Sequence, residues 1–293
     1  MRLKWDEAAE ARPASASDGC TSEHQDTANA ARSHARPLLR WAGGKSWLAE
    51  SHPELLSETA GSYIEPFLGG AALFLKSRAP KAYLSDANSA LMHFYKVVAR
   101  SPEPLWDCFR QHRVEHSAEH YKNVRAIRGR NDVEAAGRFL YLNRACFNGL
   151  YRVNKRGEFN VPMGSPRFDE LNLELLLAVS RRLQLADLRA GDFGDAVAMA
   201  GRGDLLVLDP PYTVAHNQNG FVRYNENIFS WADQMRLAKM AQSAVKRGAK
   251  VISTNANHAA IAALYPEQWF ELRTLTRRSS MAAEASARGS FSE

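Results

Sequence analysis

The stretch "LLVLDPPYTV" (205–214) places an acid, two prolines and an aromatic ring at the end of an apolar run. Because proline has no N–H group, Pro210 and Pro211 cannot continue a central strand, and they hold the backbone rigid with its carbonyls exposed. The Asp209 carboxylate and the Pro210 carbonyl are both acceptors, which suits a substrate –NH2 group with two hydrogens to donate. Tyr212 adds a flat face for stacking a planar base. The stretch therefore fits an amine on an aromatic ring, and the alternative is a plain strand-end turn.

A second set of residues has the pattern of a nucleoside site. "EPFLGG" (65–70) offers Gly69 and Gly70, where a backbone can approach a ligand closely. Asp86 follows Gly69 by 17 positions and ends the next apolar run. An acid about 20 residues after a glycine turn commonly bonds ribose hydroxyls. Together these residues favour a nucleoside-containing cofactor over a simple tight turn.

Two other patterns suggest chemistry that the rest of the sequence does not support. "WAGGKS" (41–46) lacks the glycine that a phosphate loop has five positions before its Gly-Lys pair, because that position is Leu39, so we exclude an ATPase. His112, His116 and His120 are spaced by four and predict one face of a helix. No carboxylate or cysteine pattern completes a zinc site there, so we expect no metal.

Composition limits the class of protein. The chain has 293 residues, 45% of them hydrophobic, which is enough for one large domain or two smaller ones. No apolar run approaches the ~20 residues that span a bilayer, and the first residues lack the apolar stretch of a secretory signal. The 3 cysteines form no CxxC pair, which indicates a reducing compartment. We therefore expect a cytoplasmic protein, and its net charge of +6 permits a polyanionic partner.

The order of predicted elements indicates an α/β fold. Strand and helix patterns alternate in residues 36–98 and again in 186–293, which is typical of βαβ units and a parallel sheet. The later strands are expected in "ADLRAGDF", "DLLVLDPPY", "AKVISTNAN" and "QWFELRTLTRRSS". Residues 99–185 are helical and charged, with a hairpin pattern in "GLYRVNKRGEFNVPMG", and we read them as an inserted module. Residues 1–35 are small and polar, and we expect a disordered tail.

Several motifs, taken together and in this order, resemble the Dam-type (D12 class) family of DNA adenine-N6 methyltransferases over about 37–281. They are "RWAGGK", "EPFLGGAALF", "LSDAN", "NRACFNGLYRVNKRGEFNVPMG", "GDF", "VLDPPY" and "RRSS". The resemblance implies a Rossmann-like, S-adenosylmethionine-dependent methyltransferase sheet with an inserted, mainly helical DNA-recognition module that carries the hairpin. One departure is Ala71, which stands where a third glycine is frequent and which we expect to be tolerated.

By the same resemblance, the cofactor is expected among five of these motifs. "EPFLGG" would pass its methionine end, Asp86 would hold the ribose hydroxyls, and "GDF" would flank the adenine. Asp209 would lie where cofactor and substrate meet. In chain order, the implied cofactor-binding residues are Trp41, Lys45, Glu65, Phe67, Gly69, Asp86, Asp192, Phe193 and Asp209.

The expected reaction combines the motif chemistry with the resemblance. The target adenine leaves the duplex, because its amine cannot be reached inside the stack. Tyr212 stacks on it, while Asp209 and the Pro210 carbonyl, held rigid by Pro211, accept hydrogen bonds from N6 and direct its lone pair to the cofactor methyl. In-line displacement from the sulfonium follows, and the protein contributes mainly alignment and charge stabilisation. The reaction requires no metal.

Double-stranded DNA is the expected partner, usually at a GATC site in this family. Arginine pairs with guanine and asparagine with adenine in the major groove, and Arg152 and Asn154 are two apart, so they share a side of a strand. For any single basic residue, a solvated surface charge is the alternative. We expect a monomer from a bacterium or a phage. The implied DNA-binding residues are Arg40, Asn148, Arg152, Asn154 and Asn160.

Other functions remain open at this level. Cytosine-N4 methylation uses the same amine chemistry, and related acid-Pro-Pro-aromatic motifs serve methylation of RNA or of protein glutamine, which the hairpin disfavours. A different class is an inactive DNA-binding protein that kept the fold, against which the intact motif 209–212 argues. A solitary regulator, a restriction partner and a phage enzyme are equally compatible with the sequence.

Overall fold

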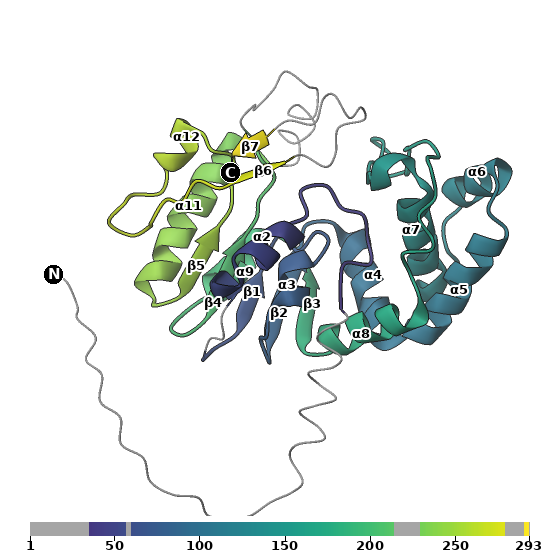
Figure 1. Ribbon diagram of the computed structural model, residues 1–293, viewed down its shortest axis with the longest axis horizontal. Coiled ribbons are helices and arrows are strands. Elements are labelled where there is room, and N and C mark those ends of the chain that lie inside the picture. The colour runs from purple at the N-terminus through teal and green to yellow at the C-terminus, as the bar shows by residue number, and fades with distance from the viewer. Residues whose placement is uncertain (1–34, 57–59, 214–228, 279–289, 293) are drawn as a thin grey trace, which may run out of the picture.

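The computed structural model describes residues 35–56, 60–213, 229–278 and 290–292 (Figure 1). The tail predicted for residues 1–35 lies outside this part of the chain, with the exception of Ala35. That residue is buried against the main core and is 3% exposed.

A single sheet of five parallel strands forms the centre of the fold, as the alternating pattern predicted (Figure 1). The strand order is β3-β2-β1-β4-β5, so the direction of the strand order reverses between β1 and β4. In open α/β sheets, ligands bind beyond the carboxyl ends of the strands at such a reversal. The strands are β1 (Tyr63–Glu65), β2 (Ala82–Asp86), β3 (Ala186–Ala190), β4 (Leu205–Leu208) and β5 (Lys250–Ser253).

Helices cover both faces of the sheet, which explains why β4 is apolar at every position. Successive side chains of a strand point to opposite faces. Leu205 and Val207 join one core, with α2 (Ser46–Ser51), α3 (Ala72–Lys76), α4 (Ser89–Arg100) and α8 (Leu173–Leu183). Leu206 and Leu208 join the other, with α9 (Phe193–Met199) and α11 (Trp231–Lys246).

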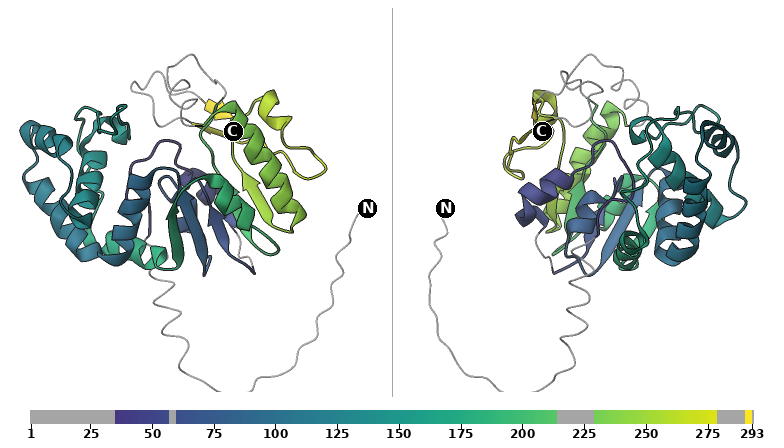
Figure 2. Two further views of the ribbon diagram at one scale, coloured as in Figure 1. Left: turned by 180° about the vertical axis from the view of Figure 1, so that it is seen from behind. Right: turned by 45° about the vertical axis from the view of Figure 1, so that its right-hand side comes forward.

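Residues 99–185 are mainly helical, as predicted. They form α5 (Pro102–Val114), α6 (Ala118–Ala126), α7 (Asp132–Ala145) and α8, and the side chains of Asn131 and Asn172 cap the starts of α7 and α8. Seen from behind, α5 to α7 and α11 lie at opposite ends of the sheet (Figure 2). The buried residues of α5 to α7 belong to the same core as Leu205 and Val207 of β4. That they form a separate recognition module stays a prediction.

The remaining short elements connect the larger ones. They are η1 (Pro53–Leu56), η2 (Phe147–Gly149), α12 (Ala259–Ala262), and the antiparallel pair of β6 (Thr276–Arg278) and β7 (Ser290–Ser292). The predicted hairpin is present as one antiparallel bridge, Val153 with Phe159, around a turn that begins at Asn154. In the described part of the chain, no helix is long and apolar enough to cross a membrane.

Two expectations about elements were wrong. The three histidines do not share one helix: α5 ends at Val114, and Ser117 caps a new helix that contains His120. His112 and His120 nevertheless meet across the break, with 3.0 Å between Nδ1 and Nε2. In the described ranges, no group of three or more His, Cys, Asp or Glu residues could hold a metal ion.

The strand predicted in "QWFELRTLTRRSS" is also mostly missing, because 268–275 join no strand and only 276–278 pair with β7. Its aromatic residues are used elsewhere. The Lys246 ammonium lies 5.3 Å from the ring centroid of Trp269, and Phe270 packs edge-on against Tyr265. Trp269 and Phe270 therefore pack near α11 and do not form a sixth strand of the sheet.

Ala71 has a backbone conformation that favours glycine. Its backbone has φ +59°, in the left-handed region, immediately before α3. That conformation costs roughly 1–2 kcal/mol for a residue with a Cβ. Gly69, two residues earlier, has φ +47° and avoids this cost.

We expect Ala71→Gly to change stability by less than about 0.5 kcal/mol. Relief of the left-handed strain offsets the loss of a buried methyl (~0.8 kcal/mol) and the greater entropy of the unfolded chain (~0.5–1 kcal/mol). Ala72→Gly is the matched control: Ala72 is also buried but has no positive φ, so it should lose about 1.5 kcal/mol. Urea unfolding measures both variants. Equal losses would show that Ala71 is not strained.

Candidate active site

Asp209 follows β4 at the reversal of the strand order, and residues from two other segments hold it. The Nζ atom of Lys45 lies 2.9 Å from Asp209 Oδ1, and Thr254 Oγ1 donates a hydrogen bond to the same oxygen at 2.6 Å. Lys45 is 3% exposed and also donates to the Gly43 carbonyl at 3.0 Å. No residue in the described ranges donates to Oδ2. The carboxylate is thus fixed through one of its oxygens.

The two prolines have different surroundings. The Pro211 carbonyl accepts a hydrogen bond from Gln234 Nε2 at 3.3 Å, and Asn255 in turn donates to Gln234 Oε1 at 3.1 Å. Gln234 lies on α11 and is fully buried. The Pro210 carbonyl has no donor within the described part of the chain. Tyr212 lies beside Lys45, whose ammonium is 5.0 Å from the ring centroid.

The glycine turn after β1 is held by Asp86 at the end of β2. Asp86 Oδ2 accepts the Gly69 N–H at 3.0 Å, and Oδ1 accepts the Asn88 N–H at 2.9 Å. The Tyr95 hydroxyl donates to the Gly69 carbonyl at 2.9 Å. Burial raises the pKa of Asp86. Asp86 therefore shapes the turn itself, and each of its oxygens keeps a second acceptor site, so a ribose contact stays a prediction.

Aromatic side chains close around this turn. A Cβ atom on Gly69 would lie 2.9 Å from Trp41 Cδ1, so Trp41 packs directly on the glycine. Phe67 packs against the core that contains Leu206 and Leu208. Its ring centroid is 5.4 Å from that of Phe193 and 5.5 Å from that of Phe229. The predicted cofactor residues of "RWAGGK", "EPFLGG" and "GDF" thus come together beyond β1.

Glu65 ends β1 and is almost completely buried, at 2% exposed. The Tyr63 hydroxyl donates to Glu65 Oε2 at 2.9 Å. Burial raises the pKa of Glu65 to about 8, and the negative charges of Asp209 and Asp86 act in the same direction. Glu65 therefore carries a proton at neutral pH when no ligand is bound.

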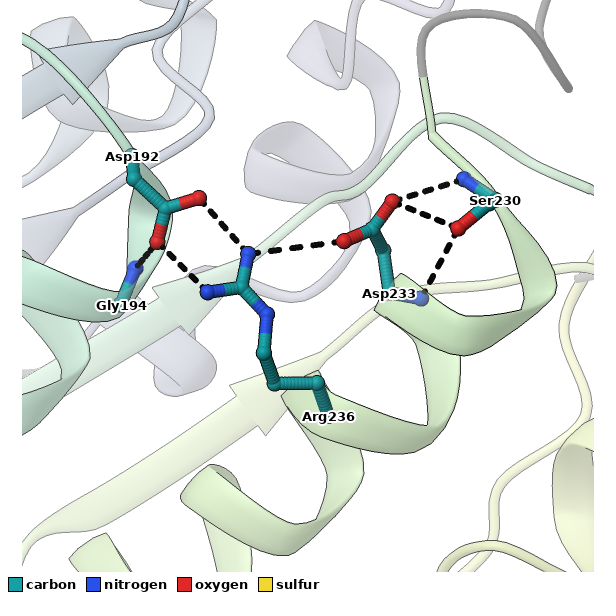
Figure 3. Close-up of polar contacts among 5 residues, drawn as sticks. All are labelled: Asp192, Gly194, Ser230, Asp233 and Arg236. Atoms are coloured by element: carbon teal, nitrogen blue, oxygen red, sulfur yellow. Dashed lines mark hydrogen bonds and ion pairs between the residues drawn. The ribbon is translucent and has the colours of Figure 1, made fainter.

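Asp192 and Phe193 begin α9 and are held by Arg236 of α11 (Figure 3). Asp192 Oδ1 accepts the Gly194 N–H at 2.8 Å, and both of its oxygens accept hydrogen bonds from the Arg236 guanidinium, at 2.8 and 2.6 Å. These bonds lower the pKa of Asp192. The guanidinium carbon lies 3.9 Å from the ring centroid of Phe193.

The predicted DNA-binding residues lie on a neighbouring surface. Asn143, which is buried, accepts the Arg40 N–H at 2.8 Å and donates to the carbonyls of Arg40 and Gly149 at 2.8 and 3.1 Å. This bond set places Arg40 beside Asn148, which has a positive φ of +53° that asparagine tolerates well. Trp41 stacks on Tyr151 with ring centroids 5.7 Å apart, so the "RWAGGK" segment and the hairpin are in contact.

In the hairpin, the exposed positions form one face, as the spacing predicted. Arg152 Nε donates to Asn160 Oδ1 at 2.8 Å, and Asn154 Nδ2 donates to Glu158 Oε2 at 2.7 Å. All four side chains are exposed, whereas Phe159 between them is buried. The structure thus groups Arg152, Asn154 and Asn160, and it does not bring them to the Asp209 cluster.

Comparison with known proteins assigns this arrangement to a family. A family model described as "D12 class N6 adenine-specific DNA methyltransferase" matches residues 41–281. A type II methyltransferase of Lactococcus lactis subsp. cremoris is 33% identical over 267 residues, 88% of this chain and 93% of that protein. The chain belongs to the D12 class of N6 adenine-specific DNA methyltransferases.

Two further relatives carry the same activity in their names. A "DNA N-6-adenine-methyltransferase" of an Escherichia phage is 34% identical over 261 residues, which cover 87% of this chain and 34% of that longer protein. The "DNA adenine methylase" of Escherichia coli is 32% identical over 227 residues, 75% of this chain and 80% of that protein. The family resemblance of the motifs is therefore confirmed.

Four residues of this methyltransferase's site were not predicted from the sequence. Thr254 follows β5 as Asp209 follows β4, so the rule that sites gather at the carboxyl ends of parallel strands could have found it. Asn143 lies in a quoted motif but had no assigned role. The other two are polar residues on a helix, where such residues usually face solvent and give no signal. These four are Asn143, Gln234, Arg236 and Thr254.

The pKa of Glu65 predicts a pH-dependent stability. Because the folded pKa of about 8 is above the ordinary 4.5, the folded state binds more protons than the unfolded state between these values. The stabilising effect of the protonated group is complete below 4.5 and is lost as pH rises through about 8. We expect the free energy of unfolding of the parent to fall across this window relative to Glu65→Gln, measured by urea unfolding without ligands. Parallel curves for the two proteins would contradict a buried, proton-binding Glu65.

Proposed function

We propose that this methyltransferase transfers a methyl group from S-adenosylmethionine to N6 of an adenine flipped out of duplex DNA, in a GATC-like site. The observation that carries the proposal is the set of hydrogen-bond partners of the Asp209 carboxylate. Lys45 and Thr254 hold one of its oxygens, and the other has no donor among the described residues. An amine with two hydrogens needs two such acceptors, and the Pro210 carbonyl supplies the second.

The residues around the glycine turn fit S-adenosylmethionine. Gly69 permits close backbone approach, and Asp86 keeps acceptor sites that match ribose hydroxyls. Phe67, which packs on the buried Phe193, offers apolar ring surface near the Asp192 carboxylate, and this combination matches an adenine with its exocyclic amine. When bound, S-adenosylmethionine supplies an electrophilic methyl group on a sulfonium. Trp41, Lys45 and Glu65 complete the proposed set of cofactor-binding residues.

In the proposed reaction, the protein orients the adenine and accepts hydrogen bonds from its amine. Tyr212 stacks on the flipped base, a contact worth ~1–3 kcal/mol per base in related systems. Asp209 Oδ2 and the Pro210 carbonyl accept hydrogen bonds from the two N6 hydrogens, so the nitrogen lone pair is turned out of the ring. Once methylated, the nitrogen is positively charged and acidic, and it releases one of these hydrogens to solvent as a proton. Pro211, held by Gln234, keeps that carbonyl in place. Fixed acceptors of this kind need no reorganisation during reaction, which is where most of their effect on rate arises.

Recognition is proposed to lie in the hairpin and the segment beside it. Arg152, Asn154 and Asn160 share an exposed face and carry the donors that read guanine and adenine edges. Arg40 and Asn148 lie between this face and the Asp209 cluster. We further propose a cytoplasmic monomer acting on double-stranded DNA, in a bacterium or a phage, from which the relatives above come.

Genome-wide mapping of modified bases tests the proposal. The chain is expressed in a host that lacks DNA methylation, and we expect N6-methyladenine at one short motif of the GATC type. Asp209→Ala, which removes the acceptor, should leave the same genome unmodified. Because it also takes this carboxylate away from the buried Lys45, circular dichroism of the purified variant checks that it is folded. Methylcytosine at N4 would replace the adenine assignment, and an unmodified genome from well-folded parent protein would contradict the proposed activity.

A further inference from the structure

Arg236 joins α9 and α11, which lie side by side on one face of the sheet (Figure 3). It lies in the second turn of α11, and its guanidinium forms two parallel hydrogen bonds with Asp192 at the start of α9. Two-point binding of this kind fixes the orientation of a carboxylate as well as its position, which a lysine cannot do.

The hydrogen bonds of Asp192 to described residues use three of the acceptor sites on its carboxylate. An ionised carboxylate has about four acceptor sites, two on each oxygen. Oδ1 accepts the Gly194 N–H and one Arg236 N–H, so it is full. Oδ2 accepts one Arg236 N–H, so one acceptor site remains on this oxygen. The pKa of Asp192 is held below its ordinary value, chiefly by these bonds, so the group stays an acceptor at neutral pH.

Arg236 is itself held from two sides. Its guanidinium carbon is 3.9 Å from the ring centroid of Phe193, so the planar group covers the aromatic ring next to Asp192. On α11, Asp233 Oδ1 lies 3.5 Å from Arg236 Nη2. Asp233 also closes the capping box of this helix with Ser230, through bonds of 2.7, 3.0 and 3.2 Å (Figure 3). The start of α11 therefore defines where the guanidinium sits.

Arg236 is 43% and Asp192 51% exposed, so solvent screens their ion pair, and it is the bidentate geometry that favours a contribution to folding. The same geometry, packed on the ring of Phe193 and with one acceptor site left, also suits presentation of that site to a ligand.

We propose that Arg236 is a positioning residue for the cofactor: it fixes the Asp192 carboxylate so that the remaining site on Oδ2 accepts a hydrogen bond from the amine of the cofactor's adenine. This inference rests on the proposed function, in which Asp192 and Phe193 flank that adenine. It assigns to α11 a part in selecting a 6-aminopurine cofactor over one with a carbonyl at that position, because the carbonyl offers no hydrogen to Oδ2.

Calorimetric binding of the demethylated cofactor product and of one analogue tests the inference. S-adenosylhomocysteine carries the purine amine, and S-inosylhomocysteine carries a carbonyl instead. For Arg236→Ala we expect the dissociation constant of S-adenosylhomocysteine to rise about tenfold, with most of the preference over S-inosylhomocysteine lost. Arg236→Lys, which can reach only one oxygen, should fall between the parent and Arg236→Ala. The KM for S-adenosylmethionine should rise in parallel, with kcat at saturation unchanged.

A matched control separates positioning from folding. Arg110→Ala removes an exposed arginine that pairs with Asp107 at 3.1 Å on α5, and it should leave both dissociation constants unchanged. Thermal unfolding checks that every variant is folded. If the parent binds S-adenosylhomocysteine and Arg236→Ala binds it with the same affinity and preference, the inference is overturned. If the folded parent binds neither compound, the proposed function itself fails.

Discussion

The ion pair between Lys45 and Asp209 connects the parts of this methyltransferase on which its site depends. The two residues are far apart in the sequence, and 2.9 Å separates Lys45 Nζ from Asp209 Oδ1. An ammonium with 3% exposure needs a partner, because an unpaired buried charge is strongly destabilising. The pair can form only because β4 lies next to β1, which brings the segment after β4 against the "RWAGGK" segment. The order of the strands in the sheet therefore determines that Lys45 and Asp209 can meet.

Helix α11 holds both the proposed catalytic turn and the proposed cofactor loop. Gln234 fixes the Pro211 carbonyl, and Arg236, two residues later, fixes Asp192. The first belongs to the proposed catalytic turn and the second to the proposed cofactor loop. A similar connection runs the other way through Asn143 and Trp41, which join the cofactor segment to the hairpin. The residues proposed for catalysis, cofactor binding and recognition are therefore held by shared neighbours rather than by separate elements.

The sequence predicted the elements well where local pattern and tertiary role agree. Strands β1 and β2 end at Glu65 and Asp86, and β4 ends one residue before Asp209. The predicted apolar runs end at the same places. It predicted poorly where distant neighbours decide. The exposed Ser117 ends a histidine pattern by capping a new helix, and the aromatic residues near Trp269 pack on α11 instead of extending the sheet. The partners of Asp209 and Asp192 depend on which helix faces which strand end. The local spacing of residues in the sequence does not show this.

The most direct test of this account is the single-turnover rate of Asp209→Asn on a duplex with a GATC site, at saturating S-adenosylmethionine. Lys45 and Thr254 both donate to Oδ1, so they would retain the amide oxygen there and leave the amide –NH2 in the place of Oδ2. A donor would then face the substrate amine. The account predicts a rate lower than the parent's by on the order of 10²-fold or more, and as low as that of Asp209→Ala. A rate within a few-fold of the parent would contradict the central claim that Oδ2 accepts the substrate amine.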